Sequence, residues 1–220
     1  MTETRGRKPG RPAGGHSGEG RAALLKAAQE LMAEQGLPRV TLREVAERAG
    51  VQPGLVNYYF GNKQGLLRAV VREVASEMLA RVQATAAGEG SPPERVREFI
   101  HGMIEANTAA PYAPRLIMEQ VLFGDSAIVE EFVESFARPN LKAMLEVFDD
   151  GVGSGRFREI DPKYVLPAMA GACAFFFLGS PLLRRIYGIE AIDSEVAREF
   201  AESTAELILH GILRRAESPA

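Results

Sequence analysis

The stretch VTLREVAERAGVQPGLVNYYFGNK, residues 40–63, decides the fold of this chain. Thr41 and Glu44 have the spacing of a capping box, in which each side chain binds the other residue's free backbone N–H at the start of a helix. Val40 and Val45 are spaced for the hydrophobic staple that accompanies such a box. A helix is therefore expected to begin directly after Thr41.

This helix is expected to be short and to be followed at once by another. Gly50 is a good helix-ending residue, after which Val51 can pack back against the preceding turn. A second helix over 53–60 begins with Pro53 in its first turn, and a third begins at Lys63. Helices this short are unstable alone, so they must pack against a preceding helix. The pattern predicts a helix-turn-helix that offers its second helix to the DNA major groove.

Two features of this segment favour contact with phosphate. The positive charge of Lys63 at a helix N-terminus is repelled by the positive end of the helix dipole. A lysine at this position is favourable only if an anion binds there. Tyr58 and Tyr59 are consecutive, so their side chains diverge, and at least one hydroxyl is expected to be exposed and able to reach a phosphate.

The remaining sequence is expected to be helical throughout. Apolar residues at spacings of three and four mark a helix over 17–35, and further segments follow the same pattern. These are residues 42–49, 63–86, 92–109, 112–123, 126–152, 162–179 and 194–214. Helix starts are expected at the caps Thr41, Asn62, Ser91, Asp161 and Ser194. Pro139 and Pro167 should disturb the helices that contain them. Because no segment shows strand alternation with hairpin turns, the fold class is all-α.

The composition indicates the class of protein, and the distribution of charge indicates where it binds its partner. The chain has 220 residues, 46% hydrophobic and 25% charged, which is typical of a globular protein. One cysteine, Cys173, allows no internal disulfide, which fits a cytoplasmic location. Residues 1–70 carry 11 Lys/Arg and 6 Asp/Glu although the whole chain has a net charge of −3. A basic N-terminal third on an acidic body indicates an anion-binding head.

The first 16 residues, MTETRGRKPGRPAGGH, are expected to be a disordered basic arm. Arg5, Arg7, Lys8 and Arg11 could enter a minor groove, and the RGRKPGRP stretch resembles an AT-hook. A solubilising tail explains the same composition equally well.

The ordered motifs between residues 18 and 68 closely resemble the DNA-binding domain of the TetR family of bacterial transcription regulators. The matching pieces are TLREVAERAGV (41–51), PGLVNYYF (53–60) and GNK (61–63), with Leu66 and Leu67 after them. The resemblance implies a three-helix DNA-binding domain over 17–68 and a larger helical domain for ligand binding and dimerisation over 69–220.

The resemblance also assigns DNA contacts. It implies base contacts by Arg43 and by Gly54 and Leu55 at the start of the next helix. Phosphates would be held by Thr41, Tyr58, Tyr59 and Lys63. An arginine contact to guanine is the commonest specific contact, although Arg43 could equally form a solvated pair with Glu47.

One position departs from the family pattern. Asn57 stands where the family usually has tyrosine. An asparagine can pair with adenine in the major groove, or it can bind a phosphate or cap locally, and these alternatives stay open.

The resemblance places an inducer pocket in the larger domain. Eight large or polar residues are chosen as its lining, although apolar stripes at helical spacing usually form core. They are Phe99, Met103, Arg115, Met118, Glu119, Phe123, Phe148 and Phe176. Arg115 and Glu119, four residues apart, could orient a polar ligand end or form a surface ion pair.

The last two expected helices, 162–179 and 194–214, resemble the family's dimer interface, where a four-helix bundle would form about a twofold axis. Small residues would allow the helices to approach closely. The expected interface residues are Ala168, Gly171, Ala172, Ala201, Thr204, Ala205 and Ile208.

No catalytic, metal or cofactor motif is present. The three histidines are isolated, and GVGSG (151–155) follows a helix, so it is expected to be a loop and not a dinucleotide site. The sequence therefore predicts no enzyme, no cofactor, no metal site and no membrane association.

Together these features predict a homodimeric regulator that binds double-stranded DNA at a palindromic operator and is released by a small-molecule effector. The alternatives are a helical small-molecule-binding protein without specific DNA binding, and a DNA-binding activator or arm-led architectural protein.

Overall fold

The computed structural model describes residues 17–124 and 126–214, and this part of the chain is helical apart from its connections and one antiparallel bridge between Phe157 and Leu213. The all-α fold class is confirmed. The α-helices are α1 (Ser17–Gln35), α2 (Leu42–Arg48), α3 (Gly54–Phe60), α4 (Lys63–Ala86), α5 (Pro92–Ala109), α6 (Ala113–Ile117), α7 (Ser126–Phe132), α8 (Arg138–Gly153), α9 (Pro162–Leu178), α10 (Ser180–Tyr187) and α11 (Ser194–Ile212).

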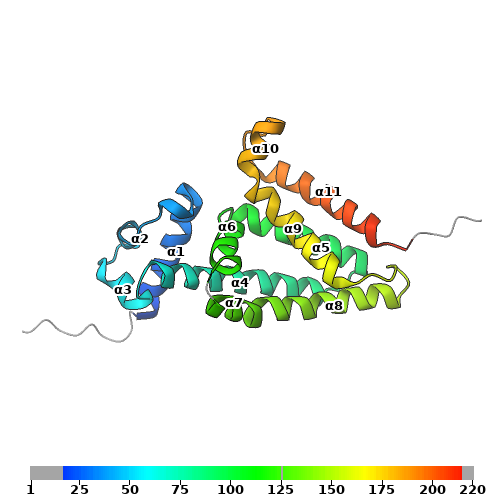
Figure 1. Cartoon of the computed structure of the whole chain (residues 1–220), viewed down its shortest axis with the longest axis horizontal. Coiled ribbons are helices and arrows are strands. Elements are labelled where there is room, and N and C mark those ends of the chain that lie inside the picture. The colour runs from blue at the N-terminus through cyan, green and yellow to red at the C-terminus, as the bar shows by residue number, and fades with distance from the viewer. Residues whose placement is uncertain (1–16, 125, 215–220) are drawn as a thin grey trace, which may run out of the picture.

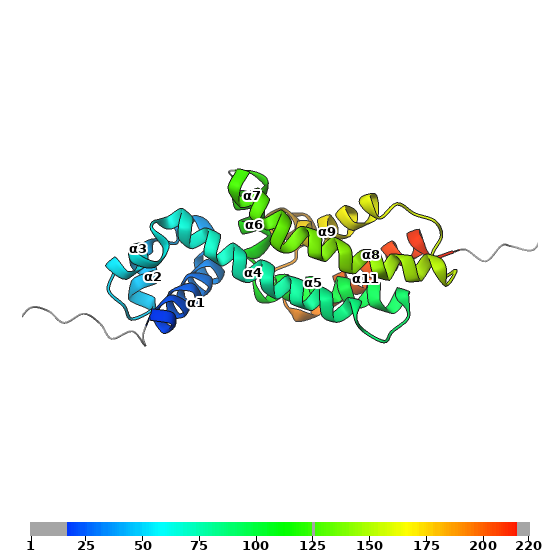
Figure 2. The same ribbon diagram turned by 90° about the horizontal axis from the view of Figure 1, so that it is seen from below.

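The head consists of α1 to α3 and the first turns of α4, and it forms one end of the elongated molecule (Figures 1 and 2). Its core is made of fully buried apolar side chains from all four helices, among them Leu24, Val45, Val56 and Leu66. Burial of these side chains supplies the stability that the seven-residue helices α2 and α3 lack alone.

Helix α4 is a single element shared by the head and the body. It has 24 residues, which corresponds to a length of about 36 Å. Leu67 and Val70 belong to the core cluster that includes the head, whereas Val82 and Ala86 belong to the second cluster in the body. The expected domain boundary at 68/69 therefore falls inside a continuous helix.

The body contains α5 to α11 and the second half of α4. Helix α11 packs along α5 more extensively than along any other element, and α4, α5 and α8 all pack against one another. Figure 2 shows α4 and α8 running side by side along the body. The second core cluster includes the fully buried Phe148, Phe157 and Met169. Phe157 lies so close to Gly151 that a Cβ at this glycine would approach the ring to 2.0 Å.

Two expected helical segments contain π-helical turns, and one of them is the segment that Pro139 was expected to disturb. The segment 112–123 begins as α6 and continues as a π-helical turn, Met118–Leu122. The segment 126–152 divides into α7, a second π-helical turn over Val133–Ala137, and α8. Pro139 lies in the first turn of α8, where its missing N–H is tolerated.

Other expectations about the helices need correction. Pro167 lies inside α9 without ending it. Proline has no N–H to donate to the carbonyl of Lys163, but both residues are exposed. The unpaired carbonyl therefore lies at the surface. Asp193, not Ser194, caps α11, since its carboxylate accepts from the backbone N–H groups of Glu195 and Val196 at 3.0 and 2.9 Å. Gly151 to Gly153, expected in a loop, form the last turn of α8.

Helix α10 was not expected from the sequence. It follows α9 after Gly179, and the axes of the two helices differ by 70°. None of its residues is buried, and Leu182, Ile186 and Tyr187 are more than half exposed. In Figure 1 it projects from the body at the end where α9 and α11 converge.

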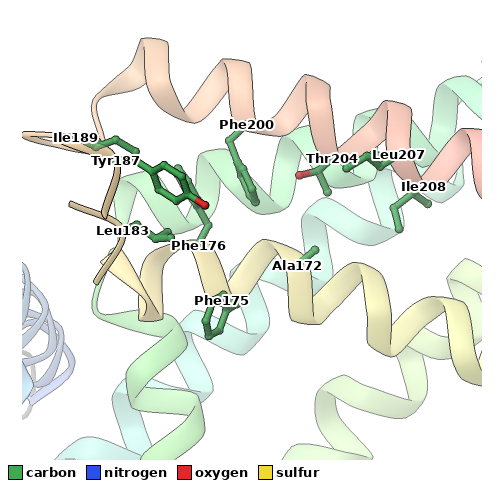
Figure 3. Close-up of a pocket in the computed structure, with 10 residues that line it drawn as sticks. All are labelled: Ala172, Phe175, Phe176, Leu183, Tyr187, Ile189, Phe200, Thr204, Leu207 and Ile208. Atoms are coloured by element: carbon green, nitrogen blue, oxygen red, sulfur yellow. The ribbon is translucent and has the colours of Figure 1, made fainter. Parts of the chain in front are cut away.

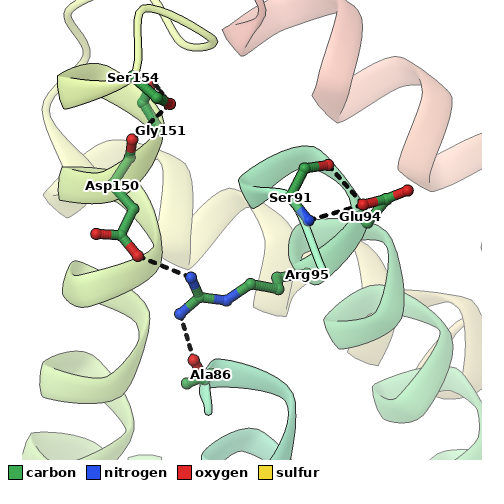
Figure 4. A network of polar contacts seen from close by, with 7 residues as sticks. All are labelled: Ala86, Ser91, Glu94, Arg95, Asp150, Gly151 and Ser154. Carbon is green, nitrogen blue, oxygen red and sulfur yellow. Dashed lines mark hydrogen bonds and ion pairs between the residues drawn. The ribbon is translucent and has the colours of Figure 1, made fainter. Parts of the chain in front are cut away.

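A buried arginine holds the far end of α4. Arg95 on α5 is 7% exposed, and its guanidinium donates to the carboxylate of Asp150 on α8 at 2.8 Å (Figure 4). The same group donates to the carbonyl of Ala86, the last residue of α4. Arg95 therefore joins the ends of three helices at the end of the body that is remote from the head.

Within the described ranges, no single helix is long and apolar enough to cross a membrane; only α9 and α10 taken together, bent by 70°, would pass by length and composition.

Candidate nucleic-acid interface

The turn between α2 and α3 is fixed by local hydrogen bonds. The capping box is present: the backbone N–H of Thr41 donates to the Glu44 carboxylate at 2.9 Å, and the backbone N–H of Glu44 donates to the Thr41 hydroxyl at 3.3 Å. The Thr41 hydroxyl also donates to the Glu44 carboxylate at 2.7 Å, and this bond, followed by the one from the Thr41 backbone N–H, lowers the pKa of Glu44 below its ordinary value. The expected capping box is confirmed.

Helix α2 ends in a Schellman motif. Gly50 has a φ of 68°, a left-handed conformation that glycine adopts without strain. The N–H groups of Gly50 and Val51 donate to the carbonyls of Glu47 and Ala46 at 3.2 and 3.0 Å. This pair of bonds fixes the direction in which the chain leaves α2 and enters α3.

Helix α3 buries one side chain and exposes the rest of its outer face. Val56 is fully buried, whereas Gly54, Leu55, Asn57 and Tyr58 are exposed. A face with an amide, a phenol and little bulk at its N-terminus can approach base edges closely.

The two tyrosines diverge as expected. Tyr58 is 77% exposed, whereas Tyr59 is half-buried, and the rings meet edge to face at 5.1 Å. Gly20 on α1 lies against the Tyr59 hydroxyl, because a Cβ at this glycine would be 3.3 Å from the hydroxyl oxygen. Tyr59 thus joins α3 to α1, and Tyr58 is the tyrosine on the open surface.

The start of α4 is built for a close chain reversal. Asn62 caps the helix, its side-chain oxygen accepting from the backbone N–H of Gly65 at 2.9 Å. A Cβ at Gly65 would lie 1.9 Å from the Phe60 carbonyl oxygen, so only glycine fits there. Lys63, the first residue of α4, is half-buried and close enough to Glu44 to lower the pKa of its carboxyl.

Arg43 is paired in the free protein. Its side chain is 83% exposed, and Nε donates to the Glu47 carboxylate at 2.8 Å, which raises the pKa of Arg43. Contact with a base requires Arg43 to leave this carboxylate. Arg48 is structural instead, because it donates two bonds to Glu34 on α1 at 2.8 and 2.7 Å; sequence reasoning missed this tie between α2 and α1.

The structure thus brings most of the expected DNA contacts onto α2, α3 and the start of α4. Thr41, Arg43, Gly54, Leu55, Asn57 and Tyr58 are exposed there, and Tyr59 and Lys63 are half-buried. The arm residues Arg5, Arg7, Lys8 and Arg11 lie outside the described residues. Which of these residues touch DNA stays a prediction.

The structure does not bring the eight residues chosen for the ligand pocket together. Phe99 lines a cavity of about 520 Å³ between α5, α8 and α9, whereas Phe176 lines a groove of about 480 Å³ between α9, α10 and α11. Arg115 lines a smaller cleft between the head and the body and forms an ion pair with Glu119 at 2.6 Å.

The other members of that set have different roles. Phe148 packs against Phe157 in the core with 5.7 Å between ring centroids, Met103 is half-buried against both core clusters, and Met118 lies in the π-helical turn. Phe123 is 77% exposed. The set shares helical spacing but not a common face of the assembled body, so the structure does not gather the eight residues around one hollow.

The residues expected on the dimer face of α11 are mostly buried within the chain. Ala201, Thr204 and Ala205 are buried within the chain, and Thr204 lies beside the groove between α9, α10 and α11 (Figure 3). Ile208 and Ala172 are half-buried, and only Ala168 and Gly171 of the expected set are exposed. The close approach that small residues permit is used inside one protomer. One helical stripe of exposed residues on α9 is formed by Tyr164, Ala168, Gly171 and Phe175, and Leu207 is exposed on α11.

Residues 17–124 and 126–214 contain no group of three or more His, Cys, Asp or Glu side chains arranged to hold a metal ion. Cys173 is buried, and burial raises the pKa of its thiol to about 12.

Family models match both the N-terminal and the C-terminal part of the chain. The family model described as bacterial regulatory proteins, tetR family, matches residues 24–70. The model described as the tetracyclin repressor-like C-terminal domain matches residues 89–217, more than half of the chain.

Curated relatives are regulators of transcription. The HTH-type transcriptional regulator RutR of Escherichia coli (strain K12) is 25% identical over 197 residues, which cover 88% of this chain and 90% of RutR. The HTH-type transcriptional regulator BetI of Rhizobium meliloti (strain 1021) is 36% identical over 91 residues, or 41% of this chain and 45% of BetI.

Solved structures have the same fold. A transcriptional regulator of the TetR/AcrR family from Thermobifida fusca matches with a TM-score of 0.69 and 27% identity, over 90% of this chain and 100% of that one. The ketosteroid transcriptional regulator KstR2 of Mycobacterium tuberculosis matches with a TM-score of 0.68 and 19% identity, over 89% and 97% of the two chains. The chain therefore belongs to the TetR family and is a DNA-binding, helix-turn-helix regulator of transcription rather than an enzyme.

Proposed function

We propose that this protein is a homodimeric repressor that binds a palindromic operator and is released from it by a small-molecule effector. The observation that carries the proposal is the exposed face of α3, with Asn57 and Tyr58, beside the exposed Arg43 on α2. In a dimer, two such faces would enter successive major grooves on one side of the DNA. We expect Arg43, Gly54, Leu55 and Asn57 to lie nearest the base edges.

The remaining contacts would position the head on the DNA backbone. Thr41, Tyr58, Tyr59 and Lys63 are the expected phosphate contacts, and the basic arm would add affinity that falls as salt concentration rises. The second protomer would pack through the exposed stripe of α9 (Tyr164, Ala168, Gly171 and Phe175) and through Leu207 of α11, in place of the buried stripe expected from the sequence.

The direct test is selection of bound sites from random duplex DNA with the wild type, Arg43→Ala and Arg138→Ala in parallel. Arg138 is a matched control because it forms the same kind of exposed pair, with Glu134 four residues earlier at 2.7 Å, but in the body. We expect a palindromic consensus for the wild type and for Arg138→Ala, and loss of preference at one position of each half-site for Arg43→Ala. No enrichment by the wild type above nonspecific binding would contradict the proposal.

The effector would act by shifting the population of head positions. A molecule that binds one arrangement of α4 about 10⁴-fold more tightly than the other would switch the protein almost completely. Calorimetric titration of the effector with and without saturating operator measures the coupling between effector binding and DNA binding. If the effector lowers the affinity for operator by some factor, the operator must lower the affinity for the effector by the same factor. Equal affinity in both titrations would rule out release by that effector.

A further inference from the structure

We propose that Arg21 and Arg39, at opposite ends of α1, bind phosphates of the two DNA strands that border the major groove entered by α3. Both residues lie outside the segment between Thr41 and Lys63 that carries the expected DNA contacts of the ordered head. The proposal rests on the proposed placement of α3 in the major groove. It adds two contacts outside that groove, which would fix the register and the angle of α3 on the duplex.

Arg21 and Arg39 are cations of the head that have no carboxylate partner. Within residues 17–124 and 126–214, neither forms an ion pair, and both are exposed. Their neighbours in the sequence are paired: Lys26 with Glu30 at 3.9 Å, Arg43 with Glu47 at 2.8 Å, and Arg48 with Glu34 at 2.7 Å. The charges of Arg21 and Arg39 are therefore available to an anion outside the chain.

The backbone around Arg39 turns its side chain to the same side as Thr41. Val40 between them is extended, with φ −69° and ψ 126°, and it is buried in the core of the head. In an extended segment, the two neighbours of an inward-pointing residue point outward together. Arg39 therefore lies on the same outer side of the head as Thr41, the expected phosphate contact at the start of α2.

Arg21 is held at the other end of α1, beside the end of α3. Its guanidinium carbon lies 5.5 Å from the centre of the ring of Phe60, the last residue of α3. This cation–π contact leaves the N–H groups of the guanidinium available to an anion. The preceding residue, Gly20, lies against the hydroxyl of Tyr59. Arg21 is therefore placed close to Tyr59, which is an expected phosphate contact.

Helix α1 is long enough to place the two arginines on opposite sides of a major groove. From Arg21 to Gln35, its last residue, the helix rises about 21 Å, whereas a major groove is about 12 Å wide. Arg39 follows in the 3₁₀ turn Leu37–Arg39. In Figure 1 the first turns of α1 lie beside α3, and its other end lies away from α3. The two arginines would thus reach one strand each.

Binding of the full chain to duplex DNA of random sequence tests these contacts without knowledge of the operator. Fluorescence anisotropy is measured over a series of salt concentrations for the wild type, Arg21→Gln, Arg39→Gln and Lys26→Gln. Lys26→Gln is the matched control, because it removes the same charge from α1 but from a residue that is paired with Glu30.

The readout is the slope of log affinity against log salt concentration, which reports the number of phosphates that the protein neutralises. We expect Arg21→Gln and Arg39→Gln each to weaken binding about fivefold and to reduce the slope by about two per dimer, one for each copy. Lys26→Gln should leave the slope unchanged. Unchanged slopes for both arginine variants, or an equal change for Lys26→Gln, would overturn the proposal.

Two further variants separate a phosphate contact from effects on folding or on net charge. Arg21→Lys keeps a positive charge beside Phe60 and should retain the wild-type slope. Arg184→Gln removes an exposed arginine of α10 that has no ion pair within the described ranges, and it should leave affinity unchanged because α10 lies in the body. Equal losses of slope in Arg21→Lys and Arg21→Gln, or weaker binding by Arg184→Gln, would contradict the assignment.

The two strands are distinguished by neutralising single phosphates of the selected operator with methylphosphonates. We expect one neutralised phosphate to have no further effect in Arg21→Gln, and another, on the opposite strand, to have none in Arg39→Gln. The same phosphate for both variants, or two phosphates on one strand, would contradict the placement of α1 across the groove. If the wild type selects no operator, the proposed function fails, and the slopes on random duplex still decide whether the two arginines bind phosphate.

Discussion

At the scale of single residues, the free protein holds its expected base-reading arginine in a local pair. Arg43 donates to Glu47 one turn later, so a base must compete with a carboxylate that also repels DNA phosphates. The spacing of the two residues predicted this ion pair, and the family resemblance predicted a contact of Arg43 with a base. Sequence alone gives no reason to choose between the ion pair and the base contact.

Removing Glu47 should therefore strengthen DNA binding. We expect Glu47→Ala to raise operator affinity about three- to tenfold, because Arg43 is released and a negative charge near the phosphates is lost. Fluorescence anisotropy with labelled operator measures the change. Glu134→Ala, which breaks the equivalent exposed pair in the body, is the control and should leave affinity unchanged. An equal gain in both variants would show that net charge alone is responsible.

The two capping boxes of the chain allow a second comparison. In both Thr41 with Glu44 and Ser91 with Glu94, the backbone N–H and the hydroxyl of the capping residue donate to the glutamate carboxylate. Both carboxyls have pKa values below their ordinary value, chiefly because the hydroxyl donates to them. We expect Thr41→Ala and Ser91→Ala each to lower the free energy of unfolding by about 1 kcal/mol near neutral pH. Only Thr41→Ala should also weaken DNA binding.

The pH dependence of these variants has a definite sign. A carboxyl with a lowered pKa in the folded state stabilises the protein above its unfolded pKa, near 4.5, and loses this contribution as pH falls through the folded value. The difference in free energy of unfolding between each variant and the wild type should therefore shrink below about pH 4. Urea unfolding at neutral and acid pH measures it, and a deficit independent of pH would mean that the hydroxyl does not act through the carboxylate.

At the scale of helices and turns, glycine ends α2 in a conformation that other residues adopt with strain. We expect Gly50→Ala to lower the free energy of unfolding by about 1 kcal/mol, because its φ of 68° is left-handed. Gly102→Ala, inside α5 where a Cβ would meet nothing within 4 Å, should raise it by about 0.5–1 kcal/mol. Chemical denaturation of both variants checks the opposite signs, and a stabilised Gly50→Ala would refute the strain argument.

An element could be predicted from sequence when the residues that determine it lie close together in the chain. The α2–turn–α3 unit could be predicted because its capping box, glycine and staple all lie within a few residues of one another. Helix α10 was missed because it is only eight residues long and lies between Gly179 and Gly188, which the sequence pattern indicates as loop. The dimer interface is hard to assign from sequence for a different reason: small residues allow close helix contact, but they do not say whether the partner is a helix of the same chain or a second copy.

At the scale of the whole molecule, cavities were the least predictable feature. Phe99 and Phe176 were both expected to line one ligand pocket, yet they line separate hollows on different sides of α9. Which hollow a residue lines depends on how whole helices meet, and helical spacing within one segment does not contain that information. The head, whose contacts are mostly local, was predicted far better than the body.

The polar tie at the far end of α4 gives a prediction for the body as a unit. Asp150→Ala removes the carboxylate partner of the buried Arg95 and should lower the free energy of unfolding by about 2 kcal/mol. Asp149→Ala, at the neighbouring exposed position on α8, is the control and should have little effect. Thermal and urea unfolding measure both variants, and equal stabilities would show that Arg95 is held by Ala86 alone.

Helix α4 can also be considered as a lever, with its fixed end where Arg95 binds the last carbonyl and its free end in the head. A rotation of only about 5° about the fixed end would move the free end of this helix, about 36 Å away, by about 3 Å. That displacement is close to the rise of one base pair along DNA, about 3.4 Å. In a dimer with two such levers, a small change in the body would suffice to put two recognition helices out of step with the base pairs of one operator.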